Sequence, residues 1–279
     1  MDPTDAADPR AWIGRSEVAH DHIAARPVRA LAATLDHPDV PVPEGTPLPP
    51  LWHWLFFLPL HRASELGDDG HARRGGFLPP VPLPRRMWAG GRFEFRATVR
   101  VGENVLRKEG RNGPLVFVTV RHEFGRDGGG AQPVLVEWHD IVYRDSRRPT
   151  DVEPPPQRAT DDATWQRTLV PDAVLLFRFS ALTFNGHRIH YDRRYATGVE
   201  GYPGLVVHGP LVATLLVDLL RRHRPDAELA GFAYKAMRPA FDERPLTLCG
   251  RPEGSVVRLW AHDHEGALVM DATATLRGA

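Results

Sequence analysis

Residues able to exchange protons are crowded into one short part of this 279-residue chain. Asn185, His187, His190 and Asp192 all lie within eight consecutive positions. An imidazole can take up and return a proton near neutral pH, and a side-chain amide can orient a water molecule. The segment is therefore the first candidate for acid–base chemistry, with His190 and His187 as alternative bases.

A glycine follows this cluster at the start of the most strongly predicted helix. Between Pro210 and His223, leucines recur at helical spacing, the proline suits the first turn, and basic residues suit the last turn. Gly209 would begin this helix, where unpaired N–H groups and the helix dipole favour negative charge. A histidine facing that position would combine a base with an oxyanion donor. Addition of water to a conjugated thioester requires both.

The two halves of the chain resemble each other in their strand-rich parts. The run FEFR at 93–96 precedes FAYK at 232–235 by 139 positions, and alternating strands at 134–143 and 267–276 end the halves. We predict an α+β fold of two similar units. Their ranges are residues 1–143 and 165–279, joined by a polar, proline-rich linker over 144–164. Shorter helices are expected over 28–35 and 51–58, and an irregular loop over 61–86.

Composition excludes several classes of function. Lys and Arg total 35, as do Asp and Glu, so no basic excess favours nucleic acid. The lone Cys249 cannot form an internal disulfide and is expected to be a buried structural thiol. We expect no secretory signal, no membrane span and a cytoplasmic location. The histidine spacing differs from that of zinc proteases and no CxxC is present, so no metal is expected.

Four longer motifs carry a resemblance to a known family. They are RRMWAGG at 85–91, PLVFVTVRHE at 114–123, SALTFNGHRIHYD at 180–192 and GYPGLVVHGPL at 201–211. The chain resembles the MaoC-like hot-dog hydratases and dehydratases. Its motifs are most similar to the branch that contains mesaconyl-C4-CoA hydratase, itaconyl-CoA hydratase and the 3-hydroxyacyl-thioester dehydratases of type 2. The resemblance implies a double hot-dog, in which each unit is an antiparallel sheet wrapped around a helix.

The resemblance also implies a reaction and assigns residues to it. The reaction is reversible hydration of a 2-enoyl-CoA, with a short branched or dicarboxylic acyl group such as mesaconyl or itaconyl. His190 matches the catalytic histidine of the family motif, and Gly209 matches its oxyanion donor. Asn185 stands where the motif has a catalytic Asp, while His187 and Arg188 replace its Asn and Pro. A neutral amide is not a general base. We therefore predict that His190 acts as base and then acid while Asn185 holds the water.

Coenzyme A, as part of the substrate, needs cations or polar groups for its phosphates, and no other cofactor is expected. The candidates near the motif are Arg188, Arg193, Arg194, His208, Lys235 and Arg238, with Arg85 and Arg86 as further ones. An acyl carrier protein would serve equally as the thioester carrier, and a homodimer of the fused unit is compatible with the pattern.

The first unit lacks a matching Asn/His cluster, so we expect it to shape the acyl-binding side. Its aromatic residues would fill the core or line the acyl tunnel; they are Trp52, Trp54, Phe56 and Phe57. Two alternatives stay open. A hot-dog thioesterase would use the same helix start to attack the carbonyl carbon. A non-catalytic acyl-thioester-binding protein would explain the loss of the motif's Asp at Asn185.

Overall fold

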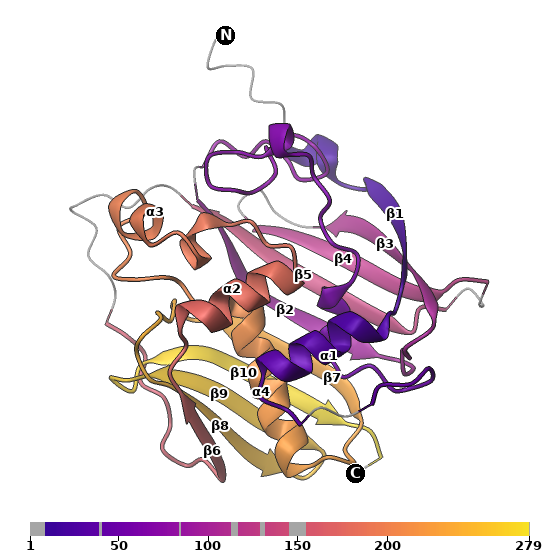
Figure 1. Cartoon of the computed structure of the whole chain (residues 1–279), viewed down its shortest axis with the longest axis vertical. Coiled ribbons are helices and arrows are strands. Elements are labelled where there is room, and N and C mark those ends of the chain that lie inside the picture. Colours follow the sequence, from indigo (N-terminus) through magenta and orange to yellow (C-terminus); the bar gives the residue numbers. More distant parts are fainter. Residues whose placement is uncertain are drawn as a thin grey trace.

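Alternating apolar and polar residues produce one long antiparallel sheet in the computed structural model, which describes residues 9–38, 41–83, 85–112, 117–128, 132–144 and 155–278 (Figure 1). Its strands are β1 (Ser16–His22), β2 (Arg85–Phe95), β3 (Asn104–Asn112), β4 (Phe117–Arg126), β5 (Leu135–Arg144), β6 (Trp165–Leu169), β7 (Leu229–Ala236), β8 (Leu246–Glu253), β9 (Val256–Asp263) and β10 (Leu268–Leu276). The helices are α1 (Ala25–Thr34), α2 (Ala173–Leu182), α3 (Arg193–Gly198) and α4 (Gly209–His223). Short 3₁₀ turns cover Pro9–Trp12, Trp52–Leu55, Ala63–Glu65 and Arg188–His190.

The order of the strands confirms the predicted double hot-dog. Along the sheet it reads β1-β3-β4-β5-β2-β7-β10-β9-β8-β6, so the second half repeats the first in reverse. The two halves meet where β2 pairs with β7, and Phe93 is the register partner of Phe232. These two phenylalanines are also equivalent in the sequence similarity. The local two-fold relation between the units therefore passes close to this pair.

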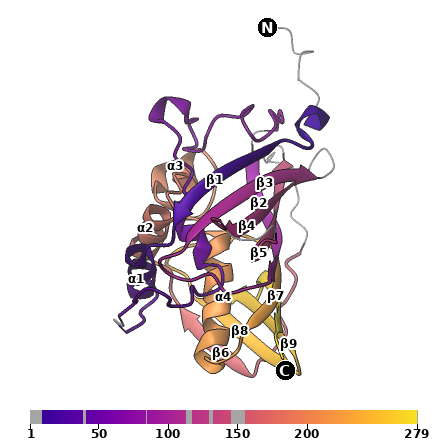
Figure 2. The ribbon, with the colours of Figure 1, turned by 90° about the vertical axis from the view of Figure 1, so that its right-hand side faces the viewer.

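Helix α4 forms the core of the second unit, as its leucine spacing predicted. Residues from Pro210 through Leu220 are all buried, and α4 packs against β6, β8, β9 and β10. Figures 1 and 2 show α4 lying along the inner face of these strands, with α1 and α2 on the same side of the sheet. The sheet therefore fixes where α4 begins.

Of the two shorter helices predicted in the first unit, one is present and the other is not. The helix expected over 28–35 is present as α1, which begins three residues earlier. The helix expected over 51–58 is wrong, because only the single turn Trp52–Leu55 forms there. Leu51 and Phe57 have φ angles of 71° and 54°, which no α-helix accommodates. Helices α2 and α3 were not predicted; Asp172 and Asp192 cap their first turns.

The loop expected over 61–86 ends earlier than predicted, because Arg85 already pairs with Arg144 at the start of β2. The linker expected over 144–164 lies partly outside the described residues, which resume at 155. From there the chain runs beside the second unit, where Thr164 donates a backbone hydrogen bond to Gly250 at 2.9 Å. The exact limits of the two units stay a prediction.

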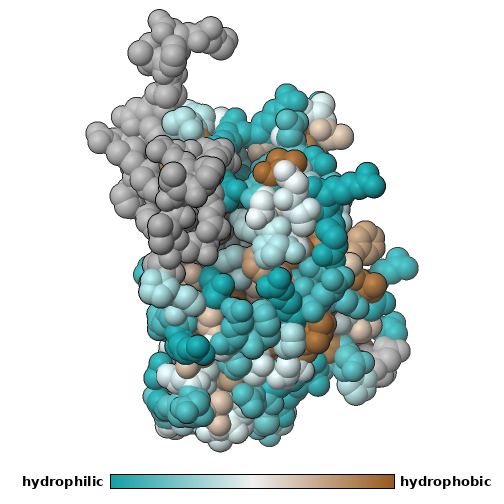
Figure 3. Space-filling view, turned by 90° about the vertical axis from the view of Figure 1, so that its left-hand side faces the viewer, coloured by the Kyte–Doolittle hydropathy of each residue, from teal (hydrophilic) through white to brown (hydrophobic). Residues whose placement is uncertain are grey.

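Other expectations can be checked directly. Cys249 is buried in β8, and burial raises the pKa of its thiol, which confirms a structural cysteine. No helix among the described residues is long and apolar enough to cross a membrane. On the face shown in Figure 3, hydrophilic residues predominate and apolar residues form scattered spots.

Candidate active site

His190 is held against the start of α4 by two contacts. Its Nδ1 lies 2.7 Å from the carbonyl oxygen of Val206, and its ring stacks on that of His208 with centroids 3.7 Å apart. A carbonyl accepts only, so Nδ1 donates its proton and Nε2 keeps a free lone pair. His208 directly precedes Gly209, the first residue of α4. The predicted base and the predicted oxyanion donor are therefore neighbours in space.

The backbone N–H of Gly209 is available to a ligand. The first N–H groups of an α-helix have no acceptor within the helix. Among the described residues no loop or turn hydrogen bond uses this N–H. A Cβ at position 209 would meet no atom within 4 Å, and both Gly209 and His190 line the same cavity. The glycine is thus not required by protein packing, and it leaves room for a group to approach the amide.

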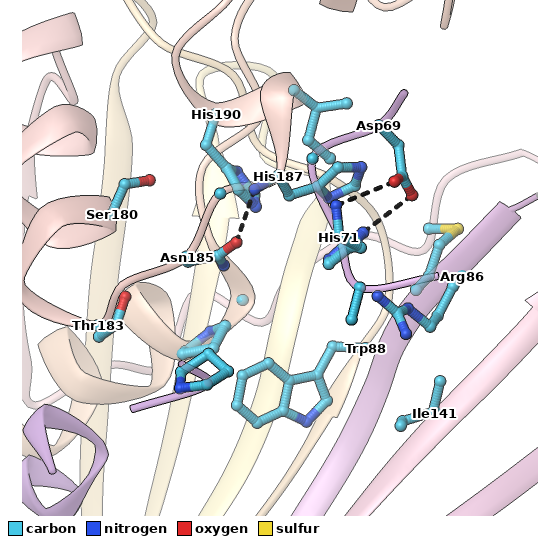
Figure 4. A pocket seen from close by; sticks show the side chains of 18 of the residues that line it. Asp69, His71, Arg86, Trp88, Ile141, Ser180, Thr183, Asn185, His187 and His190 are labelled. Atoms are coloured by element: carbon cyan, nitrogen blue, oxygen red, sulfur yellow. Dashed lines mark hydrogen bonds and ion pairs between the residues drawn. The ribbon is translucent and has the colours of Figure 1, made fainter. Parts of the chain in front are cut away.

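Asn185 uses half of its side chain to shape the loop. Its Oδ1 accepts a hydrogen bond from the backbone N–H of His187 at 3.0 Å (Figure 4). This Asx-type contact leaves the two N–H donors of the amide for the cavity that Asn185 lines. A water molecule could accept from this amide while donating a proton to the free Nε2 of His190.

A loop of the first unit completes the site, which the sequence did not predict. Asp69 accepts hydrogen bonds from the backbone N–H and the Nδ1 of His71, both at 3.0 Å. The ring of His71 contacts that of His187, with centroids 4.0 Å apart. Gly70 permits this docking, because a Cβ there would lie 1.9 Å from the carbonyl oxygen of Gly186. Both units therefore contribute side chains to one site.

Burial keeps the histidines of this site neutral. It lowers the pKa of His190 to about 4 and that of His187 to about 2, where His71 contributes further. Burial also holds the pKa of His208 well below its usual value. For Asp69, burial alone would raise the pKa, but the hydrogen bonds from His71 hold it well below its usual range. The site thus contains one carboxylate and neutral imidazoles at pH 7.

These residues line a cavity of about 2200 Å³ between the two units. Figure 4 shows His190, His187 and Asn185 on one side and Arg86 and Trp88 of β2 on the other. The volume exceeds what a short acyl group alone would occupy, so an extended thioester can enter. Asp69, His71 and His187 also present three ligand atoms within 4.8 Å of one another. Both carboxylate oxygens of Asp69 are already engaged by His71.

The predicted coenzyme A contacts separate into two groups. Lys235 and Arg238 line the cavity. His208 does not fit a direct contact, because it is fully buried behind His190 and its Nε2 lies 2.8 Å from the hydroxyl of Ser180. Three arginines near the motif are absent from the cavity wall as well; they are Arg188, Arg193 and Arg194.

Ion pairs explain the position of two of these arginines. Arg188 pairs with Asp192 at 2.8 Å, and Arg193 pairs with the buried Asp242. Arg194 is exposed. Closeness in sequence to the motif therefore does not bring these three guanidinium groups to the cavity wall. The Asp-x-His spacing of Asp69 and His71 was the sequence signal available for the missed loop.

The first unit buries a polar cluster on its own side of the cavity. Glu137 accepts hydrogen bonds from Nε2 of His53 and Nε1 of Trp54, both at 3.1 Å. Although burial acts in the opposite direction, the hydrogen bond from His53 lowers the pKa of Glu137 to about 2. Of the aromatic residues in question, Trp52, Phe56 and Phe57 are buried in the core, while Trp54, Phe56 and Phe57 also line the cavity.

The fold defines a class of protein, a double hot-dog, and its two units enclose a candidate site for acid–base chemistry. A family model for hydroxyacyl-thioester dehydratase type 2 matches residues 51–242. The chain belongs to this family, and it is an enzyme of the hydratase and dehydratase class.

Individual relatives agree with this assignment. Mesaconyl-C(4)-CoA hydratase of Chloroflexus aurantiacus is 48% identical over 98% of this chain and 99% of its own length. The mitochondrial hydroxyacyl-thioester dehydratase type 2 of Schizosaccharomyces pombe is 26% identical over 86% of this chain and 91% of its own. The crystal structure of HtdX from Mycobacterium tuberculosis covers 93% of this chain and 99% of that one, with a TM-score of 0.67. At 14% identity, this last likeness shows the fold alone.

Proposed function

We propose that this enzyme adds water reversibly to a short 2-enoyl-CoA whose acyl group is branched and dicarboxylic, with mesaconyl-C4-CoA as the first substrate to test. The similarity to mesaconyl-C(4)-CoA hydratase over nearly the full length of both chains supports the substrate class. The observation that carries the chemistry is the packing of His190 against the residues that precede Gly209.

In the proposed reaction the thioester oxygen accepts a hydrogen bond from the N–H of Gly209. A water molecule accepts from the amide of Asn185 and donates to Nε2 of His190. As the water oxygen bonds to C3, His190 takes the proton. The electrons of the C2–C3 double bond then form a C1–C2 double bond, and the carbonyl electrons move to the thioester oxygen, which gives an enolate. His190 then returns a proton to C2, which gives the 3-hydroxyacyl thioester, and dehydration follows the same path backwards.

Several further statements belong to the same proposal. The reaction needs neither a metal nor an organic cofactor besides the coenzyme A of the substrate. Lys235 and Arg238 are proposed to contact that coenzyme A, because they line the cavity. We propose a cytoplasmic location, and a homodimer of the double hot-dog as the assembly to test.

The test is incubation with mesaconyl-C4, mesaconyl-C1 and itaconyl thioesters of coenzyme A, read by mass spectrometry. A gain of one water without free thiol is expected for at least one of them. Free thiol would instead indicate a thioesterase. Saturable binding without turnover on any of these thioesters, or on their 3-hydroxyacyl forms, would indicate a binding protein.

A further inference from the structure

Arg86 of the first unit lies in the cavity wall, where the charge of Asp69 and the hydroxyl of Tyr143 act on its guanidinium. It lies near the start of β2 and lines the cavity (Figure 4). Among the described residues no carboxylate lies within ion-pair distance of its guanidinium, whereas the adjacent Arg85 pairs with Glu200 at 3.3 Å. A half-buried cation that has lost part of its hydration favours an anionic partner. The position is therefore suited to an anionic part of a ligand.

A β-bulge aims this part of β2 into the cavity. Trp88 and Phe93 are five residues apart, a spacing that places side chains on opposite faces of a regular strand. Both nevertheless contact Trp54, with ring centroids 5.3 and 5.7 Å away. The register shift between Trp88 and Gly90 brings them to the same face. Arg86 precedes Trp88 by two residues and so shares its face.

A series of ring contacts between the histidines of the site extends from His190 toward Arg86. From His190, a ring contact of 5.4 Å reaches His187, and one of 4.0 Å reaches His71. The charge of Arg86 helps to lower the pKa of both His71 and His187, which agrees with a guanidinium close to them. A substrate with its thioester at Gly209 and C3 beside His190 would therefore direct a substituent of C3 toward Arg86.

We propose that Arg86 binds a free carboxylate on C3 of the acyl group and so selects dicarboxylic enoyl thioesters. A guanidinium matches a carboxylate with two parallel hydrogen bonds, which gives direction as well as affinity. The orientation of the acyl group in this inference rests on the proposed function. In mesaconyl-C4-CoA, C3 carries a methyl group and the free carboxylate, so the carboxylate would lie one bond from the carbon that water attacks.

The experiment measures binding of two saturated thioesters that cannot be hydrated. 2-Methylsuccinyl-C4-CoA keeps the carboxylate on C3, and isovaleryl-CoA carries a methyl group in its place. Calorimetry with the wild-type enzyme should show about 10- to 100-fold tighter binding of the carboxylated thioester. Arg86→Met should abolish this preference while leaving isovaleryl-CoA binding within about threefold. Arg86→Lys, which keeps the charge but loses the fork, should retain part of the preference.

Arg92→Met is the matched control, because Arg92 lies exposed on the same strand with its guanidinium over the ring of Trp138. It should leave both affinities unchanged. Equal weakening of both thioesters by Arg86→Met would overturn the proposal, since they share only coenzyme A and the isobutyl skeleton. Equal wild-type affinities would overturn it as well. The same proteins are assayed with mesaconyl-C4-CoA, so that selective binding without hydration would contradict the proposed function and not the carboxylate subsite.

Discussion

The two units share a sheet topology but differ in what fills its concave side. In the second unit the 15-residue helix α4 occupies this space and is buried almost along its whole length. In the first unit the sequence between α1 and β2 forms the four-residue turn Trp52–Leu55 and a loop without a long helix. Residues of the first unit's own sheet, among them Phe124 and Glu137, line the cavity.

The buried polar groups of the units differ in the same way. In the second unit, His190 keeps a free Nε2 beside an open helix start. In the first unit, the carboxylate of Glu137 engages both His53 and Trp54. At these two places the second unit presents a histidine with a free ring nitrogen, whereas the first unit presents a carboxylate whose oxygens are already engaged.

Replacing one buried histidine in each unit tests this difference between the units most strongly. His190→Gln removes the base and should lower kcat by about 10²- to 10⁴-fold. His53→Gln, the matched change in the first unit, should lower kcat by less than about tenfold and act mainly on stability. Loss of enone absorbance measures turnover, and circular dichroism checks folding. Near-normal turnover of His190→Gln would contradict the assignment of the base.

Gly209→Ala should separate activity from stability. A methyl group there meets no protein atom but projects toward the cavity, so kcat should fall by about 10²- to 10³-fold, as for loss of an oxyanion donor. Alanine restricts the unfolded chain more than glycine does, so the free energy of unfolding should rise by about 0.4–1 kcal/mol. Gly198→Ala, at the end of α3 and equally open, is the control for turnover. Unchanged turnover in Gly209→Ala would contradict a substrate that packs closely against this amide.

Glu137→Gln should lower the stability of the protein and leave its turnover largely unchanged. One of the two buried donors would then face an amide N–H, which costs about 1–3 kcal/mol of unfolding free energy. The fall in kcat should be smaller than in His190→Gln or in Gly209→Ala. Glu94→Gln, on the same sheet but exposed, is the control for stability in thermal unfolding. A loss of turnover as large as that of His190→Gln would show that both units carry chemistry.

The smallest effects should appear in the dependence on pH. His190 and His187 have folded-state pKa values of about 4 and about 2, below the unfolded value near 6.5. Between these values the unfolded chain binds protons that the folded chain does not, so stability should fall as pH drops below about 6.5. His187→Asn should reduce this slope in chemical unfolding measured from pH 7 to 5. An unchanged slope would contradict a neutral, buried His187.

The same shift predicts the activity profile. A base whose pKa is near 4 stays neutral down to about pH 5, so kcat/KM should be flat from pH 8 to 5.5. A fall already at pH 6.5 would indicate an unshifted histidine as the base.

The sequence predicted those parts of the site that depend on local order. Leucine spacing and Pro210 located α4, and the segment from His190 to Gly209, which contains α3, is short enough to keep the two residues close. The duplication was visible because strand alternation survives in both units, and it correctly predicted two similar units, while the family resemblance implied the double hot-dog.

The parts that were missed depend on contacts between distant segments. Asp69 and His71 lie in a loop without periodicity, and they reach the site through a backbone hydrogen bond from Arg188 to Asp69. Nothing in the loop's composition specifies that docking. The position of Arg193 was not foreseen for the same reason, since its partner Asp242 is distant in sequence. Helix α2 escaped prediction because its apolar residues do not fall on one face; Phe177 is exposed while Leu176 is buried.

The most direct test of the central claim is a crystal structure with bound 2-methylsuccinyl-C4-CoA. The account predicts the thioester oxygen at about 3 Å from the amide nitrogen of Gly209, with C3 facing Nε2 of His190. A thioester bound elsewhere in the cavity, for example against Trp54 and His53 with the start of α4 empty, would contradict it.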